Sequence, residues 1–233
     1  MRIITVDNGN TNPHVGIFQD ERLQKIIPLK EFIPLNEDFI LTSNVGEPLH
    51  FKPSFNFKDK FKNNFFFDMP VNYSETLGDD RLIIALALFE KLKTNESILS
   101  IDAGTFITLD LINHSGFQGG FIFPGVTTFL SSYQKGSLLP LLKIKNDFEL
   151  NELPHSTEDA ILGATEIYLN SILENIIKKI NPNKIIITGG SIELIKNKIV
   201  KLSLSKVQLE TVPHLIHLSL FEIYQNHLRA TKL

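Results

Sequence analysis

Short apolar runs that end at an aspartate occur twice along the chain, and each predicts a strand followed by a polar turn. The run 3–6 leads into the turn Asp-Asn-Gly-Asn-Thr at 7–11, and a second short strand follows over 15–18. The stretch 98–112 is interrupted by Asp-Ala-Gly-Thr at 102–105, after which apolar and polar residues alternate. The pattern therefore predicts two β-hairpins, each with an Asp-x-Gly turn at its end.

The rest of the hydrophobic pattern predicts an alternation of strands and helices. Short apolar or alternating runs predict strands over 23–29, 39–44, 117–123, 184–188 and 207–209. A stretch that is apolar nearly all round predicts a buried helix over 82–93. Apolar residues at helical spacing predict a helix over 160–180, capped by residues 156–159, and further helices are predicted over 124–133, opened by Pro124-Gly125, and over 213–228. This order of elements is typical of an α/β protein.

The two Asp-x-Gly turns have the chemistry of a phosphate-binding site. Glycine tolerates positive φ and lets the backbone come close to an anion. Successive N–H groups and the hydroxyl of the threonine can then bind phosphate oxygens. The carboxylate in front would repel phosphate, so we expect it to hold a cation that bridges to the phosphate. A single copy is more often an ordinary hairpin turn, whereas two copies in the same strand context favour a nucleotide clamp.

Length, composition and charge exclude several classes of function. A chain of 233 residues with 42% apolar and 21% charged residues is typical of a globular protein with one large or two small domains. The formal net charge of −3 gives no electrostatic reason to bind nucleic acid. The absence of cysteine excludes disulfides and thiolate chemistry and suits a cytoplasmic protein. We expect no membrane association, because no apolar run reaches the ~20 residues that a spanning helix needs.

Phenylalanines and lysines alternate over 51–62, and three further phenylalanines follow at 65–67. Such a pattern could stack and neutralise single-stranded nucleic acid. It is more often a half-buried edge strand with a solvated lysine face, and the acidic total charge favours that interpretation.

Two further groups of polar residues are candidates for a functional role. The loop over 73–81 ends in Gly78-Asp79-Asp80-Arg81, and the helix that follows favours carboxylates in its first turn. That preference does not explain the adjacent Arg81, which suggests a site. His214 and His217 share a face of the last predicted helix, but with no further metal ligand near in sequence a capping or core role is the default.

The ordered set of motifs resembles a superfamily that includes the acetate and sugar kinases, the heat-shock ATPases and actin. Two Asp-x-Gly hairpins followed by Thr188-Gly189-Gly190 carry this resemblance. It implies an α/β fold of two ribonuclease-H-like domains, with mixed β-sheets flanked by helices and an ATP cleft between them. We expect the N-terminal domain over 1–97 and the C-terminal domain over 98–233.

Within that superfamily the chain is similar to the type III pantothenate kinases, which catalyse the first step of coenzyme A biosynthesis. The similarity covers nearly the whole chain in collinear order. It rests on Asp7-Asn8-Gly9-Asn10-Thr11, Gly78-Asp79-Asp80-Arg81, Asp102-Ala103-Gly104-Thr105, the glycine-rich stretch 119–125, Leu139-Pro140 and Ser156-Thr157.

The resemblance implies roles for individual residues. ATP phosphates would be bound by Asp7, Asn8, Gly9, Asn10, Thr11, Asn12, Pro13 and His14, and by Thr105. Asp102 would hold a monovalent cation, K⁺ or NH₄⁺, and Mg²⁺ would accompany ATP. Pantothenate would meet Gly78, Asp79, Asp80, Arg81 and Thr157, with Asp80 as the catalytic base. The family is dimeric, with the pantothenate pocket at the subunit interface, so a homodimer is expected.

The expected activity is ATP-dependent phosphorylation of pantothenate to 4′-phosphopantothenate. Asp80 lies near a predicted helix start, where the helix dipole should lower its pKa and make it a weak base but a good hydrogen-bond acceptor. Arg81 could pair bidentately with the substrate carboxylate or with a transferred phosphate oxygen. The alternative is a catalytically weak or inactive homologue that acts as a nucleotide-binding or transcriptional accessory protein. Phe106, which stands where the family usually has a small residue, keeps this alternative open.

Overall fold

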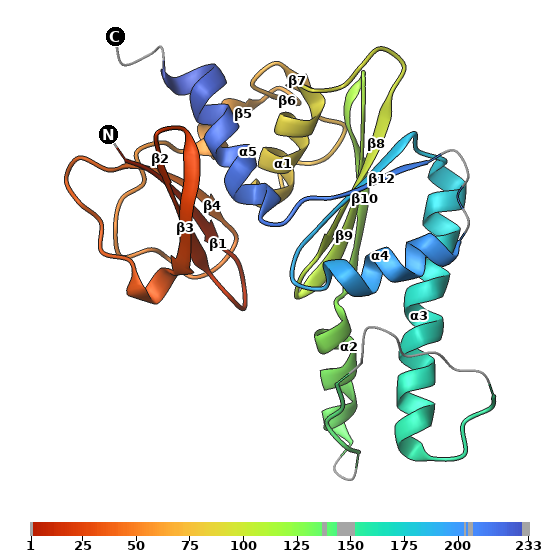
Figure 1. Cartoon of the computed structure of the whole chain (residues 1–233). Helices are drawn as coiled ribbons and strands as arrows, with labels where there is room; N and C mark the ends of the chain where they lie inside the picture. Colours follow the sequence, from red (N-terminus) through yellow and green to blue (C-terminus); the bar gives the residue numbers. More distant parts are fainter. Residues whose placement is uncertain (1, 137–138, 144–151, 203, 205–206, 230–233) are drawn as a thin grey trace. The chain divides into compact units, whose positions relative to one another are not determined.

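The computed structural model of the chain describes residues 2–136, 139–143, 152–202, 204 and 207–229. Their contacts group them into two compact units, which can be followed by colour in Figure 1. Unit 1 combines Met1–Asn95, Ile112–Gly119 and His214–Leu233, and unit 2 combines Glu96–Leu111 and Gly120–Pro213. The division into two domains after residue 97 stays a prediction.

The main sheet of unit 1 has the order β3-β2-β1-β4. Its strands are β1 (Ile3–Asn8), β2 (His14–Gln19), β3 (Arg22–Pro28) and β4 (Phe39–Asn44). Strand β1 runs antiparallel to β2 and parallel to β4, so it is hydrogen-bonded along both edges. The four predicted strands are confirmed, and their ends shift by at most two residues.

Both faces of this sheet are covered, which explains why β1 is buried almost continuously. Helices α1 (Asp79–Phe89) and α5 (Leu215–Ile223) pack against the sheet and against each other (Figure 1). Helix α5 continues as a π-helical turn, η4 (Tyr224–Leu228), and its Phe221 stacks on Phe18 of β2 with ring centroids 4.2 Å apart. A separate cluster of buried apolar side chains consists of Ile4, Val6, Val15, Phe32 and Ile40.

Helix α1 begins three residues earlier than predicted and ends at Phe89 rather than at 93. Gly78 has extended backbone angles and serves as the N-cap, so Asp79 and Asp80 lie in the first turn, as predicted. Its side chains from Leu82 to Leu88 are all buried, which confirms the prediction of a helix that is apolar nearly all round. Helix α5 starts two residues later than predicted, because His214 adopts a left-handed conformation with φ of 58° before it.

The phenylalanine- and lysine-rich segment does not form the predicted edge strand. It folds instead as a 3₁₀ helix, η2 (Phe57–Lys60), followed by three two-residue strands, β5 (Phe61–Lys62), β6 (Phe65–Phe66) and β7 (Met69–Pro70). Asn63 and Asn64 take positive φ in the turn between β5 and β6. Phe57 and Phe66 are buried and the lysines are exposed, as predicted, but Phe65 is 48% exposed, so the predicted separation of apolar and solvated side chains holds only in part.

The five-stranded sheet of unit 2 has the order β10-β9-β8-β11-β12. The predicted hairpin is formed by β8 (Ser97–Ala103) and β9 (Phe106–Asn113), and β10 (Gly116–Pro124) follows, the tip of the β9–β10 hairpin belonging to unit 1. β11 (Lys184–Thr188) runs parallel to both β8 and β12 (Gln208–Thr211). The mixed sheets and flanking helices of the predicted α/β fold class are confirmed.

Helices α2 (Val126–Ser132), α3 (Thr157–Ile180) and α4 (Ile192–Lys201) belong to unit 2. Ser156 caps α3 by accepting a hydrogen bond from the Asp159 amide, as its sequence predicts. A buried ion pair of 3.0 Å between Lys198 and Glu166 joins α4 to α3. Within the ranges that the structure describes, none of the helices has the length and apolarity that crossing a membrane requires.

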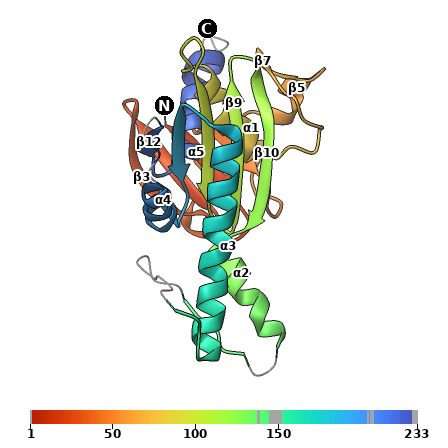
Figure 2. The same ribbon diagram turned by 90° about the vertical axis from the view of Figure 1, so that its right-hand side faces the viewer.

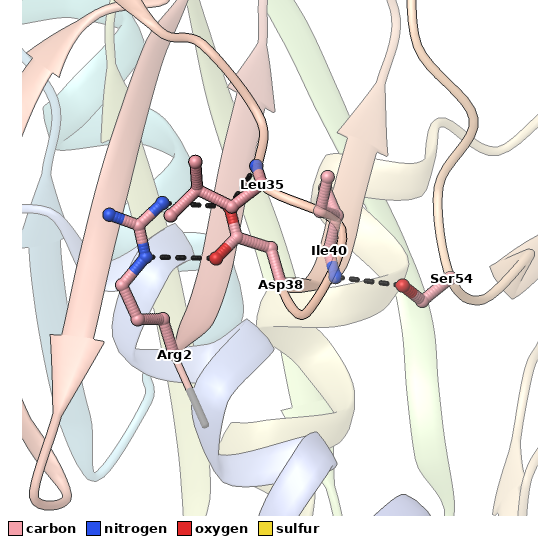
Figure 3. A network of polar contacts seen from close by, with 5 residues as sticks. All are labelled: Arg2, Leu35, Asp38, Ile40 and Ser54. Atoms are coloured by element: carbon pink, nitrogen blue, oxygen red, sulfur yellow. Dashed lines mark hydrogen bonds and ion pairs between the residues drawn. The ribbon is translucent and has the colours of Figure 1, made fainter.

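A polar network lies at the end of the unit 1 sheet where β1 and β4 begin (Figure 3). The guanidinium of Arg2 donates two hydrogen bonds of 2.8 Å to the carboxylate of Asp38, which also accepts one from the Leu35 amide. The side chain of Asp38 is fully covered. Burial alone would raise the pKa of Asp38, but the hydrogen bonds from Arg2 and Leu35 and the charge of Arg2 bring it below its ordinary value.

We expect Asp38→Asn to lower the free energy of unfolding by about 1–2 kcal/mol at pH 7, because it removes the charge from a paired, hydrogen-bonded carboxylate. A carboxylate with a lowered pKa contributes stability above its unfolded pKa and loses it as the pH falls through the folded value. Urea unfolding should therefore show the gap between wild type and variant narrowing below pH 4. Asp20→Asn, at an exposed turn, is the control, and a gap that does not depend on pH would contradict this account.

Candidate active site

Asp7 lies near the end of the central strand β1, between the two neighbouring strands. Its register partners are His14 on β2 and Ser43 on β4. The side chain of Asp7 keeps only 25% of its surface exposed, and one carboxylate oxygen lies 3.8 Å from Nδ1 of His14. Burial, and after it the negative charge of Asp80, raises the pKa of Asp7 to about 7. Two of the predicted site residues, far apart in sequence, therefore interact electrostatically in unit 1.

Asn8 fixes the start of the bend that follows Asp7. Its side-chain amide donates to the side-chain oxygen of Asn44 and to the backbone carbonyl of Glu47, each at 2.6 Å. Gly46 packs so closely that a Cβ there would lie 2.8 Å from the Asn8 carbonyl oxygen. The bend is therefore anchored to the loop after β4. Beyond this anchor the side chains of Asn10, Thr11 and Asn12 are exposed.

Asp80 lies in the first turn of α1. The amide of Arg81 donates a hydrogen bond of 2.8 Å to Oδ1 of Asp80. Burial raises the pKa of Asp80, and the hydrogen bond and positive charge of Arg81 only partly oppose this rise. The predicted lowering of this pKa by the helix dipole is wrong, because burial outweighs the favourable helix start. A carboxylate with a raised pKa is a stronger base than the sequence suggested.

Arg81 is buried against two aromatic rings. Its guanidinium carbon lies 5.1 Å from the ring centroid of Tyr73 and 5.6 Å from that of Phe117. The two rings meet edge to face, with centroids 5.8 Å apart. Both contacts are within the range of cation–π attraction, which helps to hold the guanidinium in place. Sequence reasoning missed Phe117, because this residue comes from the tip of the β9–β10 hairpin.

A cavity of about 620 Å³ opens beside the start of α1. Its lining comes from the end of β4 and the loop after it, from η2 and β5, from the segment 75–78 and from α1: Asn44, Val45, Gly46, Lys58, Phe61, Glu75, Thr76, Leu77, Gly78, Asp79 and Leu82. Asp79 is 6% exposed, and its Oδ1 has no hydrogen-bond partner among the described residues. Burial raises the pKa of Asp79, while Lys58 acts in the opposite direction. Of the predicted substrate residues, Gly78 and Asp79 line this cavity.

Asp102 and Thr105 flank the turn between β8 and β9 in unit 2. Gly189 packs so closely against Asp102 that a Cβ on Gly189 would lie 2.5 Å from Oδ1 of Asp102. The register partner of Asp102 on β11 is Thr188. The carbonyl of Thr105 accepts hydrogen bonds from the Gly125 amide at 2.9 Å and from the Thr128 hydroxyl at 2.6 Å. The second Asp-x-Gly turn and the Thr-Gly-Gly turn therefore meet at one end of the unit 2 sheet, next to the start of α2.

Thr157 is the one predicted residue of unit 2 that lies apart from this turn. It is the first residue of α3 and is exposed. Figure 2 shows α2 and α3 side by side, with the N-terminal end of α3 beyond the end of the sheet. Within unit 2, the structure does not bring Thr157 to Asp102 or Thr105.

His217 is a core histidine, as predicted by default. It is fully buried in α5, and it hydrogen-bonds to Thr5 of β1 and to His14 of β2. Its partner His14 could not be found by looking for ligands near in sequence, because the two residues are 203 positions apart. His214, which precedes α5, lies next to the same pair.

Comparison with solved structures defines the class of fold. A Campylobacter jejuni protein named for the Baf family of transcriptional activators matches 99% of this chain over its whole length, with a TM-score of 0.61 and 20% identity. The activator of the 2-hydroxyisocaproyl-CoA dehydratase from Clostridium difficile, solved with bound ADPNP, matches all of this chain and 97% of its own, with a TM-score of 0.56 and 11% identity. These likenesses establish the mixed α/β fold class that the sequence predicts.

Comparison of sequences defines the family. The model of the type III pantothenate kinases matches residues 49–179. A type III pantothenate kinase of Campylobacter hominis is 32% identical over 195 residues, which are 81% of this chain and 84% of that protein. The chain belongs to the type III pantothenate kinase family, a family of phosphotransferases. These relatives do not favour the alternative of an accessory protein.

We expect Asp7→Asn to stabilise the protein without nucleotide, and to do so more at pH 8 than at pH 5. A carboxyl group with a raised pKa binds its proton more tightly in the folded state, so wild-type stability falls as the pH rises from its unfolded pKa to about 7. The gain from the variant should grow by roughly 2–3 kcal/mol between the two pH values. Urea unfolding measures it, with the exposed Asp59→Asn as the control. An equal gain in stability at both pH values would contradict the raised pKa of Asp7.

Proposed function

We propose that this protein transfers the γ-phosphoryl group of ATP to the primary hydroxyl of pantothenate, giving 4′-phosphopantothenate and ADP. The observation that carries the proposal is the family match, whose range contains both the Gly-Asp-Asp-Arg and the Asp-Ala-Gly-Thr motifs. The reaction would be the first step of coenzyme A biosynthesis, and the protein would act in the cytoplasm.

Asp80 is the proposed catalytic base. In the transfer, the hydroxyl oxygen of pantothenate bonds to the γ-phosphorus, the bond from that phosphorus to the bridging oxygen of ADP breaks, and the hydroxyl proton passes to the Asp80 carboxylate. Phosphoryl transfer depends mainly on alignment and charge neutralisation, with proton removal late. Asp80 is partly buried and has a raised pKa, which suits it both to orient the hydroxyl and to accept this proton.

Arg81 and the cavity beside α1 are proposed to bind pantothenate. The rings of Tyr73 and Phe117 help to hold the guanidinium in place, and a guanidinium can pair bidentately with a carboxylate or a phosphate oxygen. The cavity has room for a small polar molecule, and the unpaired oxygen of Asp79 would accept a hydrogen bond from an N–H or O–H group. Gly78, Asp79, Asp80 and Arg81 would thus form one side of the substrate site.

Two phosphate-binding segments are proposed for ATP, each described within its own unit: Asp7 to His14 in unit 1 and Thr105 in unit 2. Asn10, Thr11 and Asn12 of the bend after Asn8 are exposed, so an anion can approach this segment. ATP would arrive with Mg²⁺, whose charge would offset the repulsion between the phosphates and the carboxylates of Asp7 and Asp80.

Asp102 is the proposed ligand of the monovalent cation. The carbonyl oxygen of Gly104, which belongs to the same turn, would add an oxygen ligand of the kind that hard cations prefer. When bound, such a cation would supply positive charge next to Thr105, the proposed phosphate ligand of the same unit.

A homodimer is proposed to complete the substrate site. Unit 2 exposes large apolar side chains on β10 and α3, with Phe121 42%, Ile122 55% and Ile167 61% exposed. Exposed apolar residues of this size are typical of an interface when they are contiguous. Thr157, which lies at the outer end of α3, would then reach pantothenate bound to the partner subunit.

The purified protein should release ADP from ATP and Mg²⁺ in a coupled assay only when pantothenate is present. The rate should rise with potassium or ammonium and not with sodium, and Asp102→Asn should abolish this difference between salts. Equal wild-type rates in all three salts would remove the cation role of Asp102, and no pantothenate-dependent release under any of them would contradict the proposed activity.

In the same assay, Asp80→Asn should lower turnover by a factor of about 100 or more, because the hydroxyl loses its base and its orienting acceptor. The KM for ATP should change little. Asp79→Asn is the matched control, since it alters the neighbouring carboxylate and should affect the KM for pantothenate more than turnover. Turnover by Asp80→Asn at the wild-type rate would show that Asp80 is not the base.

A further inference from the structure

A chain of hydrogen bonds runs from β1 through α5 to the start of β2 in unit 1. Oγ1 of Thr5 lies 2.8 Å from Nδ1 of His217, and Nε2 of His217 lies 3.0 Å from Nδ1 of His14. The Thr5 hydroxyl is also 3.2 Å from the carbonyl oxygen of Gly16, which can only accept. Thr5 and His217 are fully buried, whereas the side chain of His14 keeps 21% of its surface exposed. These hydrogen bonds therefore connect the buried Thr5 and His217 to His14, at the end of the segment 7–14.

The imidazoles of His14 and His217 are both neutral near pH 7. Burial, and after it the neighbouring His14 and His214, lowers the pKa of His217 to about 3. Burial also lowers the pKa of His14. The other titratable groups that face the pair are Asp7, 3.8 Å from Nδ1 of His14, and His214, whose ring centroid is 6.0 Å from that of His14. Each ring then carries one proton, on Nδ1 or on Nε2.

The hydrogen bonds allow only two matched placements of these protons. In the first, the Thr5 hydroxyl donates to Gly16, Nδ1–H of His217 donates to Thr5, and Nδ1–H of His14 donates to Nε2 of His217. In the second, the Thr5 hydroxyl donates to Nδ1 of His217, and Nε2–H of His217 donates to Nδ1 of His14. Any mixed placement sets two protons or two lone pairs against each other at one contact. The tautomers of the two rings are therefore linked.

The two placements differ at the far side of His14. In the first, Nε2 of His14 has a lone pair and can only accept a hydrogen bond. In the second, the same nitrogen carries a proton and can donate one. The change adds no charge to the interior, where a new charge would be costly.

We propose that Thr5 and His217 are positioning residues that set the tautomer of His14, and that a bound polyphosphate selects the placement in which Nε2–H of His14 donates to a phosphate oxygen. The inference rests on the proposed function, in which the segment 7–14 binds the phosphates of ATP. His217 would act only through His14, and it would give the phosphate site a neutral donor. This use of α5 explains why a histidine occupies a core position between two strands.

The direct test is nitrogen NMR of protein labelled with ¹⁵N-histidine, recorded without ligand and with the imido analogue of ATP and Mg²⁺. His14→Gln, His217→Gln and His214→Gln assign the signals. On binding, the proton should move from Nδ1 to Nε2 in both His14 and His217. The proposal is overturned if both rings keep their tautomers, if only one changes, or if either becomes an imidazolium.

Kinetics of matched variants give an independent readout. His217→Phe keeps the ring shape but breaks the chain, and it should raise the KM for ATP about tenfold while turnover changes less than threefold. His217→Gln restores an acceptor and a donor near the Nε2 position and should recover part of the loss. Thr5→Val should shift the KM for ATP in the same direction and keeps the test available if His217→Phe does not fold. His227→Phe, in η4, replaces a histidine that pairs with Glu90 instead, and it is the control.

The outcomes separate this inference from the proposed function. If the wild type phosphorylates pantothenate while the tautomers stay fixed and His217→Phe has the wild-type KM for ATP, the inference fails and the function stands. If no pantothenate is phosphorylated but the tautomers still switch on binding the ATP analogue, the function fails and the inference about the phosphate site stands. A loss in His217→Phe that affects turnover and both KM values equally would indicate general damage and would overturn the positioning role.

Discussion

The arrangement of unit 1 depends on the two-sided pairing of strand β1. Its hydrogen bonds to β2 and β4 fix Asp7 opposite His14 on one side and Ser43 on the other. Because helices and loops cover the sheet, this pairing also holds a carboxylate largely out of water. The Asn8 anchor, the cavity beside α1 and the histidine chain are all built onto strands whose register this pairing sets.

Keeping several carboxylates in such an environment has an electrostatic cost. Asp7, Asp79 and Asp80 all have raised pKa values, with burial as the largest cause in each case. A protein that needed only stability would replace such groups by neutral side chains. Their presence in unit 1 fits a site that binds cations and transfers protons, in which positive charge that arrives with the ligand offsets the carboxylate charges.

The sequence predicts the strands and hairpins well, because alternating and apolar runs directly reflect which side chains a sheet buries. It fails for the phenylalanine- and lysine-rich segment, whose two-residue strands are too short to produce a period. It also fails for the pKa of Asp80, since the helix start is visible in the sequence but the depth of burial is not. Phe117 and His217 reach their partners Arg81 and His14 across long stretches of chain, and no local pattern signals such contacts. The glycine turns and the Gly-Asp-Asp-Arg motif were readable because their chemistry is local.

The composition of unit 1 from three separate segments has a consequence for biosynthesis. A ribosome releases β1 to β4 early, whereas α5, which stacks Phe221 on Phe18 and hydrogen-bonds Thr5, emerges only after all of unit 2 has been translated. Until then α1 is the only one of the two helices available to cover that face of the nascent sheet. Unit 2 can finish folding first, even though its residues are synthesised later than most of unit 1. Folding order along this chain would then run against the usual direction from N-terminus to C-terminus.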